Sequence, residues 1–165
     1  MVTIYTDGAC LGNPGPGGFA AVLIHGEHRK EISGGYAETT NNRMELMAAI
    51  KGLEALKRPC RVTVFSDSQY VIERITGGAI HAWKANGWTR LKGRKPIRNV
   101  DLWKALYPHL SLHEITCTWV KGHAGLKENE RCDWLATDAS RGRELPPDTG
   151  YLEQKEKDSA QRELF

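Results

Sequence analysis

The chain has 165 residues, of which 40% are hydrophobic and 26% are charged, so it has the length of about one domain and the composition of a globular protein. It contains no run of about 18 apolar residues that could cross a membrane. Its first residues, MVTIYTDGAC, lack the basic and apolar regions of a secretory signal. We therefore expect no membrane span and no membrane partner.

The cysteines indicate a reducing compartment. They are widely spaced, form no C-x-x-C pair and lie near no histidine pair at zinc spacing. We predict that they are reduced thiols in a cytoplasmic protein and that they hold no zinc. These residues are Cys10, Cys60, Cys117 and Cys132.

The positive charge is concentrated in one segment. The net charge is +3, yet residues 75–100 hold six lysines and arginines and no acidic residue, so the remainder of the chain is weakly acidic. The same segment contains Trp83 and Trp88. Basic residues interleaved with aromatic ones are typical of a surface that binds a polyanion such as nucleic acid. A solvated charged loop is an equally good explanation on charge alone.

The first half of the chain predicts a strand meander followed by a helix, a strand and a second helix. Residues 8–18 are dense in glycine and proline, which predicts a long turn. Leu46, Ala49, Ile50 and Leu53 recur at helical spacing, and Thr40 or Asn41 can cap that helix. We expect strands at 2–6, 19–24, 30–38 and 61–66, and helices at 44–56 and 68–75.

The second half predicts helices around one further strand. The basic segment, 80–98, reads as a helix and a loop, followed by a helix at 99–110, a strand at 114–120 and a helix at 129–141. An antiparallel meander followed by crossover helices predicts an α/β fold with a mixed sheet. Residues 153–165 are highly charged and lack apolar periodicity, so we expect a disordered tail after a domain at 1–152.

Acidic residues border the predicted core at separate places. Asp7 and Asp67 end strands, whereas Glu45 and Asp133 lie in helices beside apolar faces. Each has an ordinary explanation as a turn or cap residue or as a partner of the helix dipole. If they converge, however, carboxylates about 4 Å apart repel by roughly 4 kcal/mol at an effective dielectric constant near 20.

A divalent cation would relieve that repulsion. Oxygen ligands without a thiol favour Mg²⁺ or Mn²⁺, and two such ions in one carboxylate cluster are suited to displacement at phosphorus. His123 lies in the glycine-rich sequence GHAG. By itself it reads as an exposed loop residue, but beside a metal cluster it could transfer protons.

Five motifs taken together resemble a type 1 ribonuclease H of the bacterial kind. Each motif is weak alone, but all five occur in order over residues 2–151, and residues 80–103 resemble the basic protrusion of that family. The motifs are YTDGAC at 5–10, NNRMEL at 41–46, SDSQYV at 66–71, WVKGHAG at 119–125 and NERCD at 129–133. The resemblance implies a five-stranded mixed sheet with helices on both sides.

The resemblance also implies an activity and a set of site residues. It implies an endonuclease that hydrolyses the RNA strand of an RNA–DNA hybrid with little sequence preference, leaving 3′-hydroxyl and 5′-phosphate ends. Metal ligands would be Asp7, Glu45, Asp67 and Asp133, with His123 assisting proton transfer and Asn129 near the last carboxylate. Substrate contacts would fall on Cys10, Asn13, Asn41, Asn42 and Gln69 in the minor groove, on Thr40 and Asn99 at a DNA phosphate, and on Trp83 along the DNA strand.

The chain departs from the pattern at one position. Some relatives carry an arginine two residues before the position of Thr40, whereas this chain has Glu38 there, and an acid would repel a phosphate. Two other functions stay open from the sequence: a nuclease of the same broad fold that acts on duplex DNA, and a nucleic-acid-binding module without activity. No apolar stripe requires a dimer, so we expect a monomer.

Overall fold

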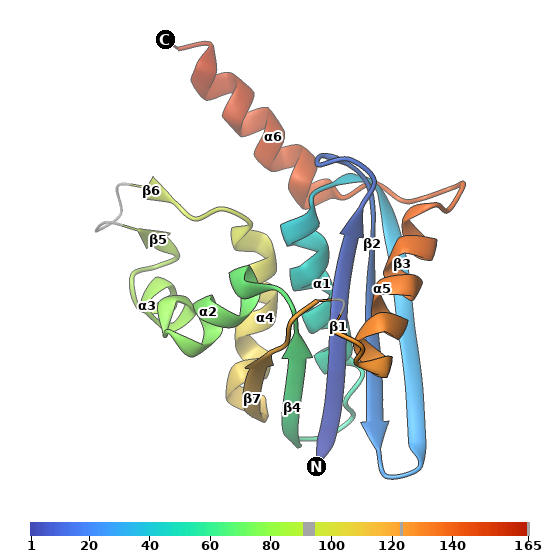
Figure 1. Cartoon of the computed structure of the whole chain (residues 1–165). Helices are drawn as coiled ribbons and strands as arrows, with labels where there is room; N and C mark the ends of the chain where they lie inside the picture. The colour runs from blue at the N-terminus through green and yellow to red at the C-terminus, as the bar shows by residue number, and fades with distance from the viewer. Residues whose placement is uncertain (91–94, 123, 165) are drawn as a thin grey trace.

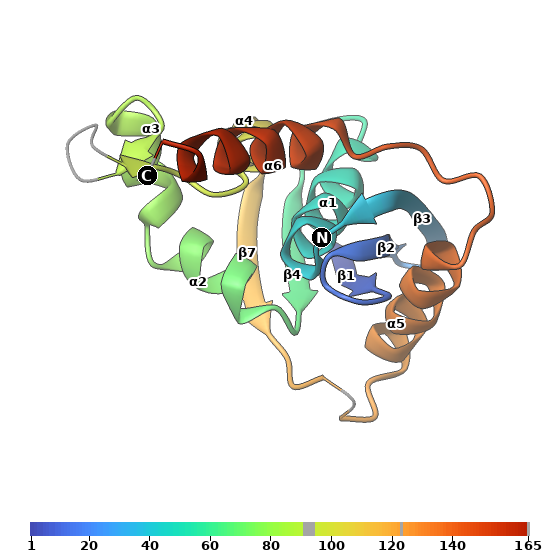
Figure 2. The same cartoon turned by 90° about the horizontal axis from the view of Figure 1, so that it is seen from above.

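In the computed structural model, which describes residues 1–90, 95–122 and 124–164, a five-stranded sheet lies between helices on both faces (Figures 1 and 2). The strand order is β3-β2-β1-β4-β7. The first three strands are antiparallel neighbours, and β4 and β7 run parallel to β1. The strands are β1 (Val2–Cys10), β2 (Gly15–His25), β3 (His28–Thr39), β4 (Arg61–Ser66) and β7 (Glu114–Trp119). This confirms the predicted meander and crossovers.

The glycine-rich region of the meander is mostly strand, so the long turn predicted at 8–18 was wrong. β1 continues to Cys10 and pairs with Gly17 there, which leaves only residues 11–14 between the strands. Glycine is required where helices press on the strand backbone. A Cβ on Gly18 would collide with the carbonyl oxygen of Ala136 in the helix beneath it.

The helices divide between the two faces of the sheet. α1 (Asn41–Glu54) and α4 (Val100–Leu112) cover one face, and α5 (Lys127–Ser140) covers the other (Figure 2). The larger core lies under α1 and includes Leu46, Ala49, Ile50 and Leu53, whereas Leu56, the last residue of the apolar face of the predicted helix, lies beyond the end of α1 at Glu54 and is only partly buried. A smaller core under α5 contains Cys132 and Ala136.

The ends of α1 and α2 show which sequence signals set them. Thr40 caps α1, and its hydroxyl accepts a hydrogen bond from the backbone N–H of Arg43 at 3.3 Å. The helix therefore begins three residues before the predicted start at 44. α2 (Gln69–Thr76) is followed by its C-cap residue Gly77, so it ends within one residue of the predicted end at 75.

The basic segment is more regular than predicted. α3 (Ala79–Ala85) is followed by a small antiparallel pair formed by β5 (Thr89–Arg90) and β6 (Lys95–Pro96). This segment projects beside the main sheet (Figure 1). The expectation of a helix and a loop was therefore incomplete.

The end of the chain is a helix, so the disordered tail predicted at 153–165 was wrong for residues up to 162. α6 (Thr149–Arg162) begins at Asp148, whose carboxylate accepts a hydrogen bond from the N–H of Tyr151 at 3.2 Å. The domain boundary at 152 stays a prediction. Among the described residues, no helix is both long and apolar enough to cross a membrane.

Candidate active site

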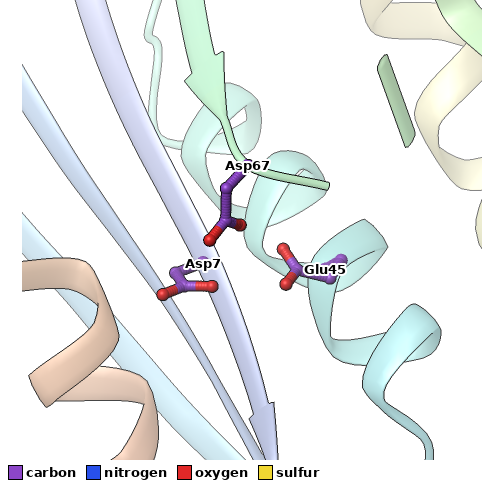
Figure 3. Close-up of side chains that lie close together, drawn as sticks. All are labelled: Asp7, Glu45 and Asp67. Atoms are coloured by element: carbon purple, nitrogen blue, oxygen red, sulfur yellow. The ribbon is translucent and has the colours of Figure 1, made fainter. Parts of the chain in front are cut away.

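Three carboxylates from distant parts of the sequence meet where the parallel pairing of the inner strands β1 and β4 ends (Figure 3). Asp7 comes from β1, Glu45 from the first turns of α1, and Asp67 from the residue after β4. Each contributes a carboxylate oxygen to a group of atoms that all lie within 4.8 Å of one another. We call these residues the carboxylate cluster.

The topology of the sheet explains why two of these acids meet. β1 and β4 are parallel neighbours whose register pairs Thr6 with Ser66. Asp7 and Asp67 therefore follow at the same level on adjacent strands. The carboxyl ends of strands in such a sheet are where active-site crevices form.

A glycine allows the third acid to approach. A Cβ on Gly8 would lie only 2.5 Å from the backbone nitrogen of Glu45, so a side chain there would push α1 away from β1. The backbone N–H of Gly8 also donates a hydrogen bond to Oδ1 of Asp7 at 2.8 Å. The glycine thus brings Glu45 close to the strand and fixes the orientation of Asp7.

The cluster is electrostatically unfavourable without a cation. Burial, with the nearby charges of Asp67 and Asp133, raises the pKa of Asp7 from 3.8 to about 7. Burial and the charges of Asp7 and Asp67 likewise hold the pKa of Glu45 well above its usual range. Charge of one sign gathered in a buried place favours either protonation or a bound cation.

The donor set of the cluster fits a hard divalent cation. Oε2 of Glu45 is buried and has no hydrogen-bond partner among the described residues. The cluster offers carboxylate oxygens only, which are the ligands that Mg²⁺ and Mn²⁺ prefer. Asp133 in α5 lies outside this group, but its charge raises the pKa of Asp7.

The remaining residues expected near the carboxylates are Asn129, as a substrate contact, and His123, as a catalytic residue. Asn129 lies in the first turn of α5, one turn before Asp133. It is buried, and its side-chain oxygen has no hydrogen-bond partner among the described residues. His123 is outside the described residues.

Some expected substrate contacts lie together near the start of α1. Oδ1 of Asn13 accepts a hydrogen bond from the backbone N–H of Asn41 at 3.1 Å. Asn42 follows in the helix and is exposed. The thiol of Cys10 lies 3.5 Å from the carbonyl oxygen of Thr39, and burial raises its pKa.

Gln69 and Trp83 lie on α2 and α3, the two helices that follow Asp67 in the chain. Gln69 is the first residue of α2 and is exposed. Trp83 is half-buried, and its ring meets that of Trp103 edge to face with centroids 5.5 Å apart. Much of Trp83 therefore packs against the core.

Thr40 and Asn99 both contact Arg43, which places them near each other. Arg43 donates its N–H to Thr40 and donates from Nη1 to Oδ1 of Asn99 at 3.4 Å. Nδ2 of Asn99 donates to the hydroxyl of Tyr70 at 3.0 Å. The side chain of Asn99 is therefore buried and already hydrogen-bonded within the protein.

Residues of α6 reach this same region, which the sequence analysis did not foresee. Gln154 accepts a hydrogen bond from the backbone N–H of Asn99 at 2.8 Å, and Lys155 pairs with Glu38 at 2.9 Å. The available signal was Asp148 as a helix cap before a stretch of good helix formers.

Comparison with known proteins shows the family of the chain. The family model described as RNase H matches residues 1–141. The chain belongs to the RNase H family. A ribonuclease H of Syntrophus aciditrophicus is 60% identical over 151 residues, covering 92% of this chain and 87% of the relative. A ribonuclease H of Aeromonas salmonicida is 59% identical over 150 residues, covering 91% of this chain and 96% of the relative.

Solved structures agree with the fold. LC9-RNase H1, described as a type 1 RNase H with the type 2 active-site motif, is 31% identical with a TM-score of 0.76, covering 87% of this chain and 74% of that one. An RNase H1 of the halophilic archaeon Halobacterium salinarum is 30% identical with a TM-score of 0.59, covering 84% and 96%. LC11-RNase H1, solved in complex with an RNA/DNA hybrid, shares the fold at 24% identity, with a TM-score of 0.62 and coverage of 84% and 96%.

Proposed function

We propose that the protein is an endonuclease that hydrolyses the RNA strand of RNA–DNA hybrids at the carboxylate cluster, leaving 3′-hydroxyl and 5′-phosphate ends. The observation that carries this conclusion is the convergence of Asp7, Glu45 and Asp67 within 4.8 Å in a chain of the RNase H family. Relatives of 52–60% identity are named ribonuclease H. A protein of the same fold has been solved with an RNA/DNA hybrid.

The carboxylate cluster, with Asp133, would hold two divalent cations, Mg²⁺ or Mn²⁺, when the hybrid is bound. The raised pKa values of Asp7 and Glu45 support cation binding, as does Oε2 of Glu45, which has no hydrogen-bond partner in the described part of the chain. Bound cations of this kind lower the pKa of an attacking water and stabilise negative charge on the leaving oxygen. Asp7 is the ligand that we expect to contact both ions, since the charges of Asp67 and Asp133 both act on it.

His123 would complete the proposed catalytic machinery, and Asn129 would contact the substrate beside it. A histidine has an unperturbed pKa near neutrality, so His123 would move a proton during hydrolysis or product release. Asn129 lies one turn before Asp133, and its amide oxygen, which has no hydrogen-bond partner among the described residues, can accept from a water, while its amide N–H can donate to a phosphate oxygen.

Recognition of the RNA strand would come from amide side chains. A 2′-hydroxyl donates and accepts hydrogen bonds, and amide groups can do both. The candidates border the cluster at the start of α1, at the end of β1 and at the start of α2. The amide candidates are Asn13, Asn41, Asn42 and Gln69, and the thiol of Cys10 is a further candidate contact.

The DNA strand would follow Thr40, Asn99, Trp83 and the basic segment 80–98. Contacts with phosphates test the geometry of the backbone without reading bases, so hybrid selectivity with little sequence preference is expected. The exposed cations Lys84, Arg90 and Lys95 lie on α3, β5 and β6.

One assay tests this function against the two open alternatives. The protein is incubated with Mg²⁺ and end-labelled RNA–DNA hybrid, duplex DNA, duplex RNA and each single strand. We expect cleavage of the RNA in the hybrid alone. Cleavage of duplex DNA would support a DNA nuclease of the same fold, and binding without cleavage would support a non-enzymatic module.

The remaining proposals concern assembly and location. We propose a monomer in the cytoplasm. The four cysteines are all free, and Cys132 is fully buried as a thiol, which suits a reducing compartment.

A further inference from the structure

Helix α6 is anchored firmly at its first turn and weakly along the remainder. Asp148, which caps α6, is 4% exposed and accepts hydrogen bonds from Arg43 at 2.8 and 3.0 Å. Tyr151 is also buried. After Tyr151 the helix projects beyond the top edge of the sheet, toward the basic segment (Figures 1 and 2).

The first contact of α6 beyond Tyr151 occupies the backbone N–H of Asn99 at the start of α4. Gln154 accepts a hydrogen bond from the N–H of Asn99 at 2.8 Å. Asn99 is the N-cap residue of α4, and its own side chain makes no capping hydrogen bond. Donors at a helix N-terminus attract negatively charged groups such as phosphates, so the amide oxygen of Gln154 takes a position that would suit a phosphate oxygen.

The second contact occupies a cation of the basic segment. Asp158 pairs with Arg98 at 2.6 Å. Gln154 and Asp158 are four residues apart on α6, so they lie on one face and about 6 Å apart along the axis. This face of α6 therefore places two acceptor groups against residues 98 and 99. Both residues belong to the surface that we propose binds the DNA strand.

The third contact is made about 100° around α6 from Gln154, and it is exposed to solvent. Lys155 pairs with Glu38 at 2.9 Å, with side chains 54% and 38% exposed. Exposed pairs of this kind contribute little to stability. A cavity of about 420 Å³ separates α6 from the segment 96–101, so close apolar packing does not fix the distal part of the helix.

We propose that α6 is an internal competitor of the DNA strand. In the docked state the oxygens of Gln154 and Asp158 occupy donors that phosphate oxygens would use, and hybrid binding displaces the part of α6 after Tyr151. This inference rests on the proposed function, since that function places the DNA strand along Asn99 and the basic segment.

The chemistry of the contacts favours competition over assistance. One N–H of Asn99 cannot serve Gln154 and a phosphate at full strength, and the carboxylate of Asp158 repels a phosphate near Arg98. The charge of Lys155, which could attract the strand, is already balanced by Glu38. Docked α6 therefore lowers the affinity for the hybrid.

The test removes the three contacts in the full-length chain. The variant carries Gln154→Ala, Lys155→Ala and Asp158→Ala, and the control carries Glu156→Ala and Lys157→Ala in the same helix. Both keep the net charge, and alanine favours the helix. Thermal melting checks that both variants fold, and KM and kcat for hybrid cleavage are compared with those of the parent.

We expect the KM of the triple variant to fall about threefold to tenfold with kcat unchanged, since a competing state reduces the apparent affinity by the fraction of competent molecules. The control should match the parent. An unchanged or increased KM in the triple variant would overturn the inference, the increase showing that α6 helps to bind the hybrid.

A binding measurement separates this inference from the proposed function. The dissociation constant for the hybrid is measured for Asp7→Asn with and without the three α6 substitutions, together with amide hydrogen exchange of residues 149–162. We expect the variant with the α6 substitutions to bind the hybrid about threefold to tenfold more tightly. In the variant that carries only Asp7→Asn, addition of hybrid should make the amides after residue 152 exchange faster. Equal affinities or slower exchange would reject the inference, whereas a parent that binds the hybrid without cleaving it would reject only the proposed function.

Discussion

Arg43 in α1 and Asp148 at the start of α6 form a buried ion pair, with 2.8 Å between Nε and Oδ2 and side chains 1% and 4% exposed. Thr39 donates to the same carboxylate at 2.7 Å, and Asp101 of α4 accepts two hydrogen bonds from Arg43 at 2.8 and 2.6 Å. These contacts tie the helix that carries Glu45 to α4 and to α6. The surroundings of the carboxylate cluster therefore depend on the guanidinium group of Arg43, which is not itself part of the cluster.

Replacing this arginine should destabilise the protein strongly. Arg43→Met leaves the buried carboxylate of Asp148 without its cation, and breaking a buried pair typically costs about 3–5 kcal/mol. Urea unfolding measures the loss. Arg61→Ala breaks an exposed pair with Glu114 and should cost no more than about 1 kcal/mol. Equal losses in the two variants would show that Asp148 is not held by Arg43.

Removing one carboxylate from the cluster should abolish cleavage. Bound cations contribute several kcal/mol of transition-state stabilisation, so Asp7→Asn should lower kcat by at least about 10³-fold. Binding of the hybrid in Mg²⁺ should stay within about tenfold, which is 1.4 kcal/mol. Asp138→Asn, an exposed acid on α5, serves as the control. An Asp7→Asn enzyme that works near the parent rate would remove Asp7 from the site.

The pKa of Asp7 predicts a pH-dependent stability in the absence of metal. Burial, with Asp67 and Asp133, raises this pKa from 3.8 to about 7, so the folded state binds the proton more tightly than the unfolded state. The protonated carboxyl group of Asp7 therefore stabilises the folded state at low pH, and this contribution is lost as the pH rises from about 4 through 7. The Asp7→Asn variant has no carboxyl group at this position, so its stability does not fall in this way as the pH rises.

The variant should therefore match the parent near pH 4 and exceed it at pH 8. The expected difference at pH 8 is about 2–4 kcal/mol, since each pKa unit corresponds to about 1.4 kcal/mol. Thermal unfolding in the presence of a chelator measures it. Added Mg²⁺ should stabilise the parent more than the variant, and a difference that does not change with pH would contradict the raised pKa.

The position of the acids was predictable because it follows from local signals. Asp7 and Asp67 each follow a run of apolar and β-branched residues, and they stand where the parallel pairing of β1 with β4 ends. The apolar stripe of α1 likewise predicted which residues are buried. These features depend on residues close in sequence and on one rule of sheet topology.

The role of α6 was not predictable because its anchors are distant. Asp148 pairs with Arg43, 105 positions away, and Gln154 binds Asn99, 55 positions away. The helix carries little apolar periodicity of its own, so its sequence resembles a disordered tail. The burial of Asn99 depends on the same long-range contacts, and no local pattern indicates them.

The exposed cations of the basic segment should determine how binding depends on salt. Each phosphate contact contributes about 0.9 to the slope of log K against log salt concentration. Replacing Lys84, Arg90 and Lys95 with alanine should therefore weaken hybrid binding and flatten this slope by up to about 3.

The matched control removes three exposed cations from the other end of the sheet, Lys30, Lys57 and Arg58, near the turn between β2 and β3 and the link between α1 and β4. Both variants lose the same net charge, so a general electrostatic effect would change the two slopes equally. A slope that flattens only in the first variant locates phosphate contacts on the basic segment. Equal slopes in that variant and the parent would place the nucleic acid elsewhere on the molecule.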